Sequence, residues 1–379
     1  ARLTKKNMRF FNYRLQFTLL LLIVPIIFGC QTTEASTDFI FGKKLVNPSN
    51  PNIVYHGRIN FADTHAPEMY WPGSGFTLWF EGTSIEVVLD DTKGNKYNNY
   101  YNAIIDDNIS EIKVIQCTEG EVSYKVAEGL KPGIHKLQLL RRTDTTTPVT
   151  KFMGIKIDPE KQLVEPQEEQ PLLKIEFYGD SITSGHGILD ESRNNNDDRA
   201  TWNNYLTYGA KTARALNADY RCISMSGIGM MVSWYDLIMP QLYDQLIPWS
   251  EFSKWDFSQW QADIVVINLG QNDSWLINNM PNRPNTEQRI DAYFNFIRSI
   301  REKYNNAKIV CTLGNMGASR SGSEWPEYIA NAVDKHNVEL NDNKVFYVPM
   351  TYKNTDGHPT VSEHQQMADV LIPFIESIL

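Results

Sequence analysis

Between about Phe39 and Asp158, hydrophobic and polar residues alternate in short segments separated by turn residues. In FTLWFEG, for example, Phe76, Leu78 and Phe80 fall on one side of an extended chain, and GIHKLQLLRR continues the same pattern. A period of two residues is typical of half-buried strands, and this region shows no helical period. Residues 39–158 therefore predict an all-β domain, either a sandwich or a barrel.

The pattern changes after residues 159–171, whose prolines and charges predict a linker. From there on, short apolar runs alternate with segments of helical period. The predicted strands are 173–179, 219–224, 263–269, 308–313 and 344–349, and the predicted helices are 201–216, 236–247, 286–303, 324–337 and 362–378. Ser362 and Gln365 predict a capping box at the start of the last helix. Alternation of this kind predicts a doubly wound parallel sheet over residues 172–379.

The first thirty residues form a separate segment, in which several basic residues precede an apolar stretch from Phe17 to Phe28. The stretch is short for a membrane span and follows positive charge, which predicts a secretory signal. It closes with IFGC, which resembles a bacterial lipobox and implies a lipid on Cys30, followed by a polar tether over 31–38. Gln31 follows the cysteine, where an aspartate would retain some lipoproteins at the inner membrane. We therefore expect a periplasmic or outer-membrane lipoprotein of a Gram-negative bacterium. A cleaved signal with a chance cysteine is the alternative.

Composition narrows the class of protein. The chain has 379 residues, 42% of them hydrophobic, and a formal net charge of -9. An acidic balance without a long basic run argues against nucleic-acid binding. Beyond Cys30, the cysteines at 117, 222 and 311 are far apart and form no CxxC pair, so they indicate neither a zinc site nor a disulfide framework.

Candidate chemistry begins at the end of the first predicted strand of the second region. The strand closes at Gly179, and Asp180 and Ser181 follow directly. A serine on a tight turn after a buried strand is where α/β enzymes place nucleophiles. Gly-Asp-Ser is a weak signal by itself, because a serine at this position is also a common helix cap.

The carboxyl ends of the other strands supply matching residue types. SGIG contains Gly227 and Gly229 after the second strand, GQND contains Asn272 after the third, and DGHP contains His358 after the fifth. Ligands of doubly wound sheets bind at these ends. Histidine is suited to accept a proton from Ser181, and amide groups are suited to stabilise an oxyanion. A glycine amide can approach a substrate without an intervening side chain.

The ordered motifs GDS, SGxG, GxND and DxHP resemble blocks I, II, III and V of the SGNH (GDSL) hydrolase superfamily, over essentially all of residues 172–379. Together with the preceding all-β segment, the chain resembles carbohydrate esterase family two. Members of that family join a jelly-roll domain to an SGNH domain and remove acetyl groups from hemicellulose sugars. The resemblance implies a jelly-roll sandwich followed by a flavodoxin-like, three-layer α/β/α domain.

The resemblance also implies roles for individual residues. Ser181 matches the nucleophile, and its backbone N–H matches the first oxyanion donor. For the second donor, counting from the preceding strand favours Gly229, with Gly227 as the alternative. The side chain of Asn272 matches the third donor, and His358 matches the general base.

The third catalytic member is left open by a departure from the superfamily pattern. Most members carry an acid three residues before the histidine, where this chain has Thr355; Asp356 lies two residues before. Asp356 is either a triad member or part of an ordinary Asp-Gly turn, in which case a backbone carbonyl orients the base of a Ser–His dyad. Trp234 and Trp275, near strand ends, either stack on sugar rings or belong to the core.

We therefore expect a secreted carbohydrate O-acetyl esterase that acts on acetylated plant polysaccharide or oligosaccharide, such as acetyl xylan or glucomannan. Two alternatives are a GDSL lipase-like esterase for longer acyl chains and a non-catalytic, glycan-binding surface lipoprotein. Neither a metal nor an organic cofactor is implied, since His186, His364 and Asp356 have no diagnostic ligand spacing.

Overall fold

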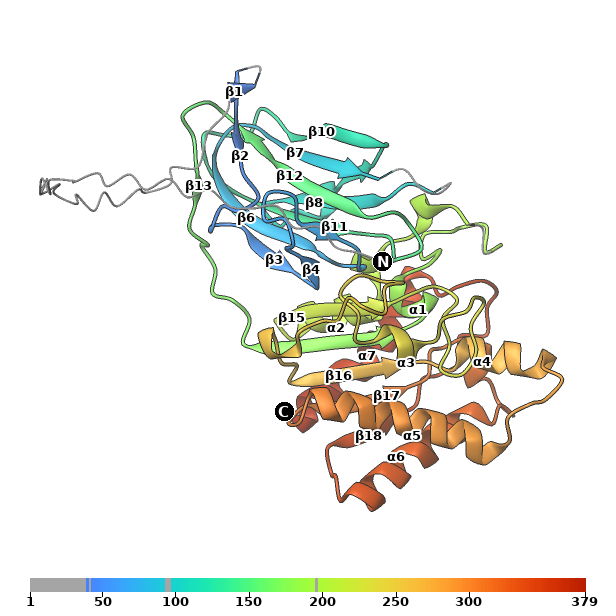
Figure 1. Cartoon of the computed structure of the whole chain (residues 1–379). Coiled ribbons are helices and arrows are strands. Elements are labelled where there is room, and N and C mark those ends of the chain that lie inside the picture. The colour runs from blue at the N-terminus through green and yellow to red at the C-terminus, as the bar shows by residue number, and fades with distance from the viewer. Residues whose placement is uncertain (1–38, 41, 93–96, 195–196) are drawn as a thin grey trace, which may run out of the picture. The chain divides into compact units, whose positions relative to one another are not determined.

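The alternating region folds into two antiparallel sheets that pack face to face, as seen in the computed structural model (Figure 1). The structure describes residues 39–40, 42–92, 97–194 and 197–379. One sheet contains β1 Phe39–Ile40, β2 Lys43–Val46, β4 Ile59–Asn60, β5 Glu68–Met69, β7 Ile85–Asp91, β10 Gly120–Ala127 and β12 Thr150–Ile157. The other contains β3 Val54–His56, β6 Gly75–Gly82, β8 Tyr100–Ile105, β9 Lys113–Gln116, β11 Gly133–Arg141 and β13 Leu163–Val164.

The predicted alternation sets the register of these strands. In the β6–β11 pair, Leu78 lies opposite Leu137 and Phe76 lies opposite Leu139. All four side chains belong to the sandwich core, which both sheets line. The all-β prediction is confirmed in its sandwich form. Strand β13 lies within the predicted linker and pairs with β6, so ordered structure extends past residue 158.

The second region forms a five-stranded parallel sheet with the strand order β15-β14-β16-β17-β18. Its strands are β14 Leu173–Gly179, β15 Ala218–Ser224, β16 Ile264–Asn268, β17 Lys308–Thr312 and β18 Val345–Val348. The helices are α1 Ser181–Ser184, α2 Tyr208–Ala215, α3 Met239–Leu242, α4 Gln271–Leu276, α5 Thr286–Lys303, α6 Trp325–Leu340 and α7 Val361–Ile378. This order is that of the flavodoxin-like sheet, so the predicted fold class is confirmed.

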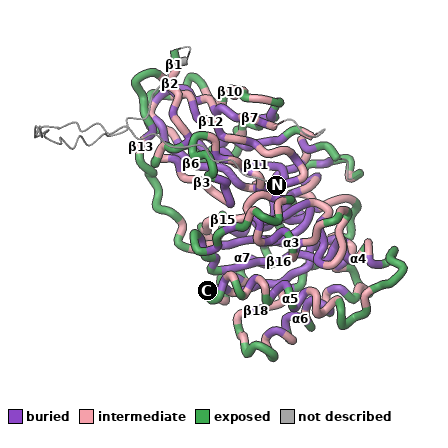
Figure 2. The backbone as a smooth tube through the Cα atoms, viewed as in Figure 1, coloured by how far each residue is buried: buried purple, intermediate pink, exposed green. Residues whose placement is uncertain are grey.

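Helices cover both faces of the parallel sheet. In β16, Val265 and Ile267 pack with the α5 and α6 side, whereas Val266 packs with the α7 side. Alternate residues of a strand point to opposite faces of the sheet. Because helices cover both faces, the residues of β16 are apolar on both sides, and the strand is buried throughout (Figure 2).

Helix starts differ from the sequence predictions where local hydrogen bonds decide them. The helix predicted over 201–216 begins only at Tyr208, because the Thr207 side chain caps it there. Of the helix predicted over 236–247, only the four residues of α3 are helical. The capping box of α7 is formed by Thr360 and Glu363, not by Ser362 and Gln365. The short 3-10 helices are η1 Ile109–Glu111, η2 Arg199–Thr201, η3 Asn204–Leu206, η4 Phe257–Gln259, η5 Ile277–Asn279 and η6 Gly317–Ser319.

A buried arginine connects the sandwich to the parallel sheet, within one compact unit. Arg58 forms an ion pair of 3.0 Å with Glu176 of β14 and donates to the Tyr178 hydroxyl at 2.9 Å. Both charged side chains are fully buried. Removing one partner of such a pair leaves a buried charge uncompensated, typically at a cost of about 3–5 kcal/mol. The two regions are therefore joined by a specific contact.

The predicted signal and lipobox, with Cys30, lie outside the described residues. Cys117, Cys222 and Cys311 are buried free thiols. Within the part of the chain that the structure describes, no helix is long and apolar enough to cross a membrane.

Candidate active site

The candidate residues leave three adjacent strands at the same end of the sheet. Gly179 of β14 lies opposite Ser224 of β15 and opposite Asn268 of β16. Ser181 follows Gly179 by two residues, and the loops containing Gly227 and Asn272 begin at the same level of the neighbouring strands. Since adjacent strands lie about 4.8 Å apart, these loops converge on a small volume around the Ser181 turn.

Ser181 and His358 are in contact. His358 Nε2 lies 2.8 Å from Ser181 Oγ, although the two residues are 177 positions apart. In the sheet, β18 lies three strands from β14, so the loop before His358 must return across the ends of β17 and β16. The distance allows the Ser181 hydroxyl to donate to a neutral imidazole, which is the geometry that a serine nucleophile and its base need.

Burial sets the protonation state of the candidate base. Desolvation, followed by the charges of His186, His364 and Lys353, holds the pKa of His358 well below its usual range. The imidazole is therefore neutral at neutral pH. A neutral ring presents an acceptor nitrogen to Ser181, whereas a protonated ring would not.

Asp356 lies outside this contact. It is exposed, and its backbone carbonyl accepts hydrogen bonds from Arg193 and from Lys353 Nζ, the latter at 3.0 Å. Among the described residues, no hydrogen bond joins its carboxylate to His358. The Thr355 hydroxyl, at the position where most of the superfamily has an acid, contacts Glu363. The geometry therefore favours a Ser–His pair without Asp356.

The structure favours Gly227 over Gly229 as the backbone oxyanion donor, contrary to the count from the strand. The Gly229 N–H donates to Ser233 Oγ at 2.9 Å, and a Cβ at this residue would lie 2.0 Å from the Val232 carbonyl oxygen. Close packing thus explains the glycine at 229. Gly227 has φ of +86°, and its N–H has no hydrogen-bond partner in the described part of the chain. The same is true of the Ser181 N–H, at the start of α1.

Asn272 is fixed by two hydrogen bonds and retains donor capacity. Its Nδ2 donates to the Ile228 carbonyl at 2.7 Å, and its Oδ1 accepts from Trp234 Nε1 at 3.1 Å. A primary amide has two N–H donors, so one remains for a ligand. Trp234 and Trp275 are 63% and 42% exposed, which places neither ring in the core.

Asp273 stabilises the loop that follows β15. Its buried carboxylate accepts the N–H groups of Met230, Met231 and Val232 at 2.7–3.1 Å. Burial raises the pKa of Asp273, and the three backbone donors oppose that rise. The neighbouring Asp180 caps α1 through the Ile182 N–H, while burial raises the pKa of Asp180 to about 7. Among the described residues, neither carboxylate is hydrogen-bonded to His358.

A stack of planar groups lies behind His358 and was not predicted from the sequence. The ring of His186 lies parallel to that of His358, with centroids 4.1 Å apart at 6°. Trp202 stacks on the other face of His186 at 4.1 Å, and the Arg199 guanidinium lies 3.8 Å from the Trp202 ring. His186 lies five residues after Ser181, but nothing in the linear pattern indicates which ring it meets. His364 accepts the Tyr208 N–H at 3.1 Å and also lies in the buried interior.

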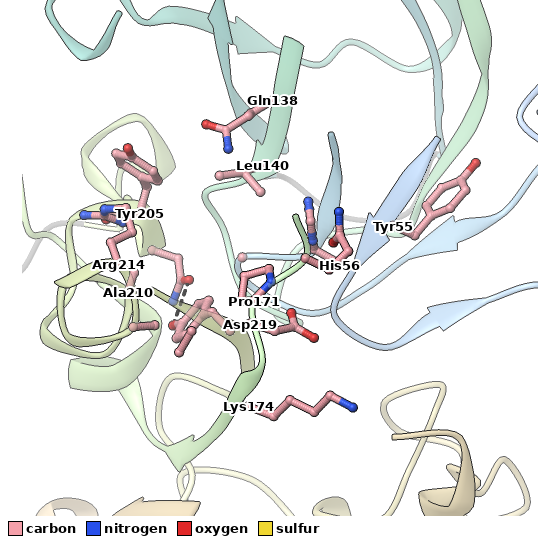
Figure 3. Close-up of a pocket in the computed structure, with 16 residues that line it drawn as sticks. Tyr55, His56, Gln138, Leu140, Pro171, Lys174, Tyr205, Ala210, Arg214 and Asp219 are labelled. Atoms are coloured by element: carbon pink, nitrogen blue, oxygen red, sulfur yellow. Dashed lines mark hydrogen bonds between the residues drawn. The ribbon is translucent and has the colours of Figure 1, made fainter. Parts of the chain in front are cut away.

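A separate cavity of about 390 Å³ lies at the opposite ends of β14 and β15 (Figure 3). Its lining includes His56, Leu140, Lys174, Tyr205 and Asp219. Lys174 precedes Ser181 by seven residues, which in an extended strand span about 20 Å. This cavity contains neither Ser181 nor His358 and is not the reaction site.

Comparison with known proteins places this site in a family. Residues 55–166 match the family model "Carbohydrate esterase 2 N-terminal", and residues 177–369 match "GDSL-like Lipase/Acylhydrolase family". The chain is 32% identical to Cellulase/esterase CelE of Acetivibrio thermocellus, over 87% of this chain but only 40% of CelE. It is 27% identical to an acetylxylan esterase/glucomannan deacetylase of Cellvibrio japonicus, over 94% of this chain and 95% of that protein.

A solved structure agrees with both matches. It is a family two carbohydrate esterase from Clostridium thermocellum in complex with cellohexaose, with a TM-score of 0.78 and 30% identity, covering 86% of this chain and 98% of that one. The fold and the comparisons define a carboxylic ester hydrolase of the GDSL type. Within that class, the chain belongs to the family two carbohydrate esterases.

Proposed function

We propose that this carbohydrate esterase removes O-acetyl groups from hemicellulose, such as acetyl xylan or glucomannan, by a serine acyl-enzyme mechanism. The observation that carries the proposal is the 2.8 Å contact between Ser181 Oγ and a half-buried His358, whose lowered pKa keeps the ring neutral. It lies beside backbone N–H groups that have no partner in the described chain. The name of the Cellvibrio japonicus relative supports the choice of substrate.

In the proposed reaction, Ser181 Oγ attacks the acetyl carbonyl carbon while His358 Nε2 takes the hydroxyl proton. The carbonyl oxygen becomes an oxyanion that accepts hydrogen bonds from the N–H groups of Ser181 and Gly227 and from Asn272 Nδ2. Collapse of the tetrahedral intermediate breaks the ester bond, and His358 gives its proton to the leaving sugar oxygen, which departs as a hydroxyl group. Water, deprotonated by the same imidazole, then attacks the acetyl-serine, and His358 returns that proton to Ser181 Oγ as the acyl bond breaks and acetate leaves.

The two exposed tryptophans are suited to the sugar part of the substrate. Trp234 is tied to Asn272 through its indole N–H, which leaves the ring itself 63% exposed next to the oxyanion donor. Trp275 follows on α4. Aromatic faces provide apolar contact area, as pyranose rings require. We assign both rings to substrate binding, and replacing them should weaken hydrolysis of a polysaccharide more than hydrolysis of an aryl acetate.

The function is tested by measuring acetate release from a panel of acetylated xylans and glucomannans, with Ser181→Ala as the inactive control. Nitrophenyl esters of increasing chain length are assayed in parallel. The proposal requires acetate release by the wild type, loss of that release in Ser181→Ala, and activity that falls beyond acetate. Higher activity on long acyl esters would indicate the lipase-like alternative. Glycan binding without any hydrolysis would indicate the non-catalytic one.

For location, we propose that the natural protein carries a lipid on Cys30 and faces the periplasm or the cell exterior. The support is the sequence IFGC after a positively charged, apolar segment. Expression of the natural gene with Cys30→Ser should move the protein from the membrane fraction to the soluble fraction. An unchanged distribution would contradict the lipid anchor without affecting the proposed chemistry.

A further inference from the structure

Two side chains that the proposed reaction does not use fix the peptide groups on either side of Ser226. The Tyr235 hydroxyl donates to the Ser226 carbonyl oxygen at 2.7 Å. In the preceding peptide group, the Ser226 N–H donates to Asp144 Oδ2 at 2.6 Å. The segment is therefore held on both sides of Ser226, immediately before the Gly227 N–H.

The first of these bonds determines where the Gly227 N–H points. A trans peptide group is planar, so its carbonyl oxygen and its N–H point in opposite directions. The Ser226 carbonyl and the Gly227 N–H belong to the same peptide group. Fixing the carbonyl with the Tyr235 hydroxyl thus fixes the direction of the N–H. The Tyr235 ring also packs against Gly227, where an added Cβ would lie 3.2 Å from ring carbon Cε1.

Surrounding contacts keep Tyr235 in place. Its ring packs edge-on against Trp249, with centroids 5.0 Å apart. Burial, together with the nearby carboxylates of Asp144 and Asp180, raises the pKa of Tyr235. The hydroxyl therefore keeps its proton and remains a donor to the Ser226 carbonyl.

The second bond comes from the sandwich. Asp144 lies in the loop after β11 and is fully buried. Its Oδ1 accepts from the N–H of Thr146 at 2.9 Å, which leaves Oδ2 directed at Ser226. A carboxylate that accepts a backbone N–H forms a charge-assisted bond, stronger than a neutral one. The neighbouring Arg142 binds the carbonyls of Trp202 and Ala200 at 2.8 Å, so this part of the sandwich also contacts the segment behind His358.

We propose that Tyr235 and Asp144 are positioning residues for the oxyanion hole, and that the sandwich thereby forms part of the catalytic apparatus. This inference rests on the proposed function, because it assigns the two side chains to the Gly227 donor. Neither side chain touches the reacting atoms. Tyr235 acts through the peptide group that carries the Gly227 N–H, and Asp144 acts through the preceding peptide group.

The main test is Tyr235→Phe, which removes one hydroxyl and keeps the ring. The matched control is Tyr55→Phe in the sandwich, where the lost hydroxyl also donates to a backbone carbonyl, that of Pro48, at 2.8 Å. Because an oxyanion donor acts only in the transition state, kcat for an aryl acetate should fall about 10- to 100-fold in Tyr235→Phe with KM nearly unchanged. Tyr55→Phe should change kcat less than about twofold.

The second variant is Asp144→Asn, which keeps the shape of the side chain but replaces one acceptor oxygen with a donor. It should lower kcat in the same way, again with little effect on KM. All rates are expressed per active site, titrated with an aryl phosphate ester that labels Ser181, and thermal unfolding is recorded for each variant. If Asp144→Asn does not fold, Tyr235→Phe alone decides the question.

Two outcomes separate this inference from the function on which it rests. If Ser181→Ala retains activity, the proposed mechanism is wrong. If Ser181→Ala is inactive but Tyr235→Phe matches wild-type kcat, the mechanism stands and the positioning role is overturned. A rise in KM with unchanged kcat would also overturn it, since that pattern marks an effect on ground-state binding.

Discussion

The loops that carry the proposed oxyanion donors and the loop that carries His358 are fixed in different ways. On the oxyanion side, the buried carboxylate of Asp273 accepts three backbone N–H groups, and Asn272 is fixed at both ends of its amide. On the base side, residues 354–356 are exposed, and the loop is tied to Arg193 and Lys353 through the Asp356 carbonyl. The His358 ring itself is packed against His186.

This difference fits the two kinds of work. Oxyanion donors stabilise charge only if they are already aimed at it before it develops, so hydrogen bonds must fix their directions. A general base alternates between neutral and protonated forms, and stacking against flat rings restrains the orientation of its ring in both. Substitutions on the oxyanion side should therefore lower mainly kcat. Substitutions around the base should lower activity in proportion to the ring packing that they remove.

The largest effect should come from removing the base itself. In His358→Ala, kcat on an aryl acetate should fall by about 10⁴-fold or more, because serine and histidine act as a unit. His65→Ala, at an exposed histidine of the sandwich, is the control and should have wild-type kcat. Substantial turnover in His358→Ala would assign proton transfer to another group.

The next effect should come from Asn272→Ala. Loss of one oxyanion donor should cost about 3 kcal/mol, or roughly 10²-fold in kcat, with KM little changed. The comparison variant is Asn278→Ala, at an exposed asparagine whose side-chain amide donates to the Ser274 carbonyl. Equal kcat values for the two variants would exclude Asn272 from the oxyanion hole.

Removing the ring behind the base should have a smaller effect. His186→Ala should lower kcat/KM by about tenfold, since a stacked ring pair contributes about 0.5–1.5 kcal/mol. His186→Phe, which keeps a flat ring, should retain more activity than His186→Ala. If the two variants are equally impaired, stacking is not the basis of the effect.

The pH profile should show where the base titrates. Because the pKa of His358 lies well below 6.5, the neutral ring persists as the pH falls through 6.5, and protonation removes activity only at lower pH. The acid limb of kcat/KM, measured with an aryl acetate, should therefore lie below pH 6.5. A half-maximal rate at pH 6.5 or above would indicate a solvated, more mobile base.

The smallest effect should come from Asp356→Ala. Its carboxylate is exposed and forms no hydrogen bond with His358 among the described residues, so kcat should change by less than about threefold. Loss of a true triad acid would instead cost about 10⁴-fold. A drop of that size would show that Asp356 turns toward the base when substrate binds.

Much of the fold could be predicted from local pattern alone. The helix at 286–303 and the strand at 173–179 occur where the sequence predicts them, because each combines a clear period with clear end signals. The prediction of a helix over 236–247 is wrong except at Met239–Leu242. The apolar residues of this segment do pack into the core, but a mostly irregular chain can bury them as well as a helix can.

Sequence order alone determined the class of protein. It placed a serine, a carboxamide and a histidine after the first, third and fifth strands of the second region, and a parallel sheet brings the carboxyl ends of its strands to one edge. Only the tertiary structure shows that the Gly229 N–H is occupied by Ser233, that no hydrogen bond joins the Asp356 carboxylate to His358 among the described residues, and that His186 stacks on His358. The physical reason is that a group can bind the reacting atoms only if no other protein group already occupies its hydrogen bond. The protein groups that compete for these hydrogen bonds come from distant parts of the chain, so only the tertiary structure reveals them.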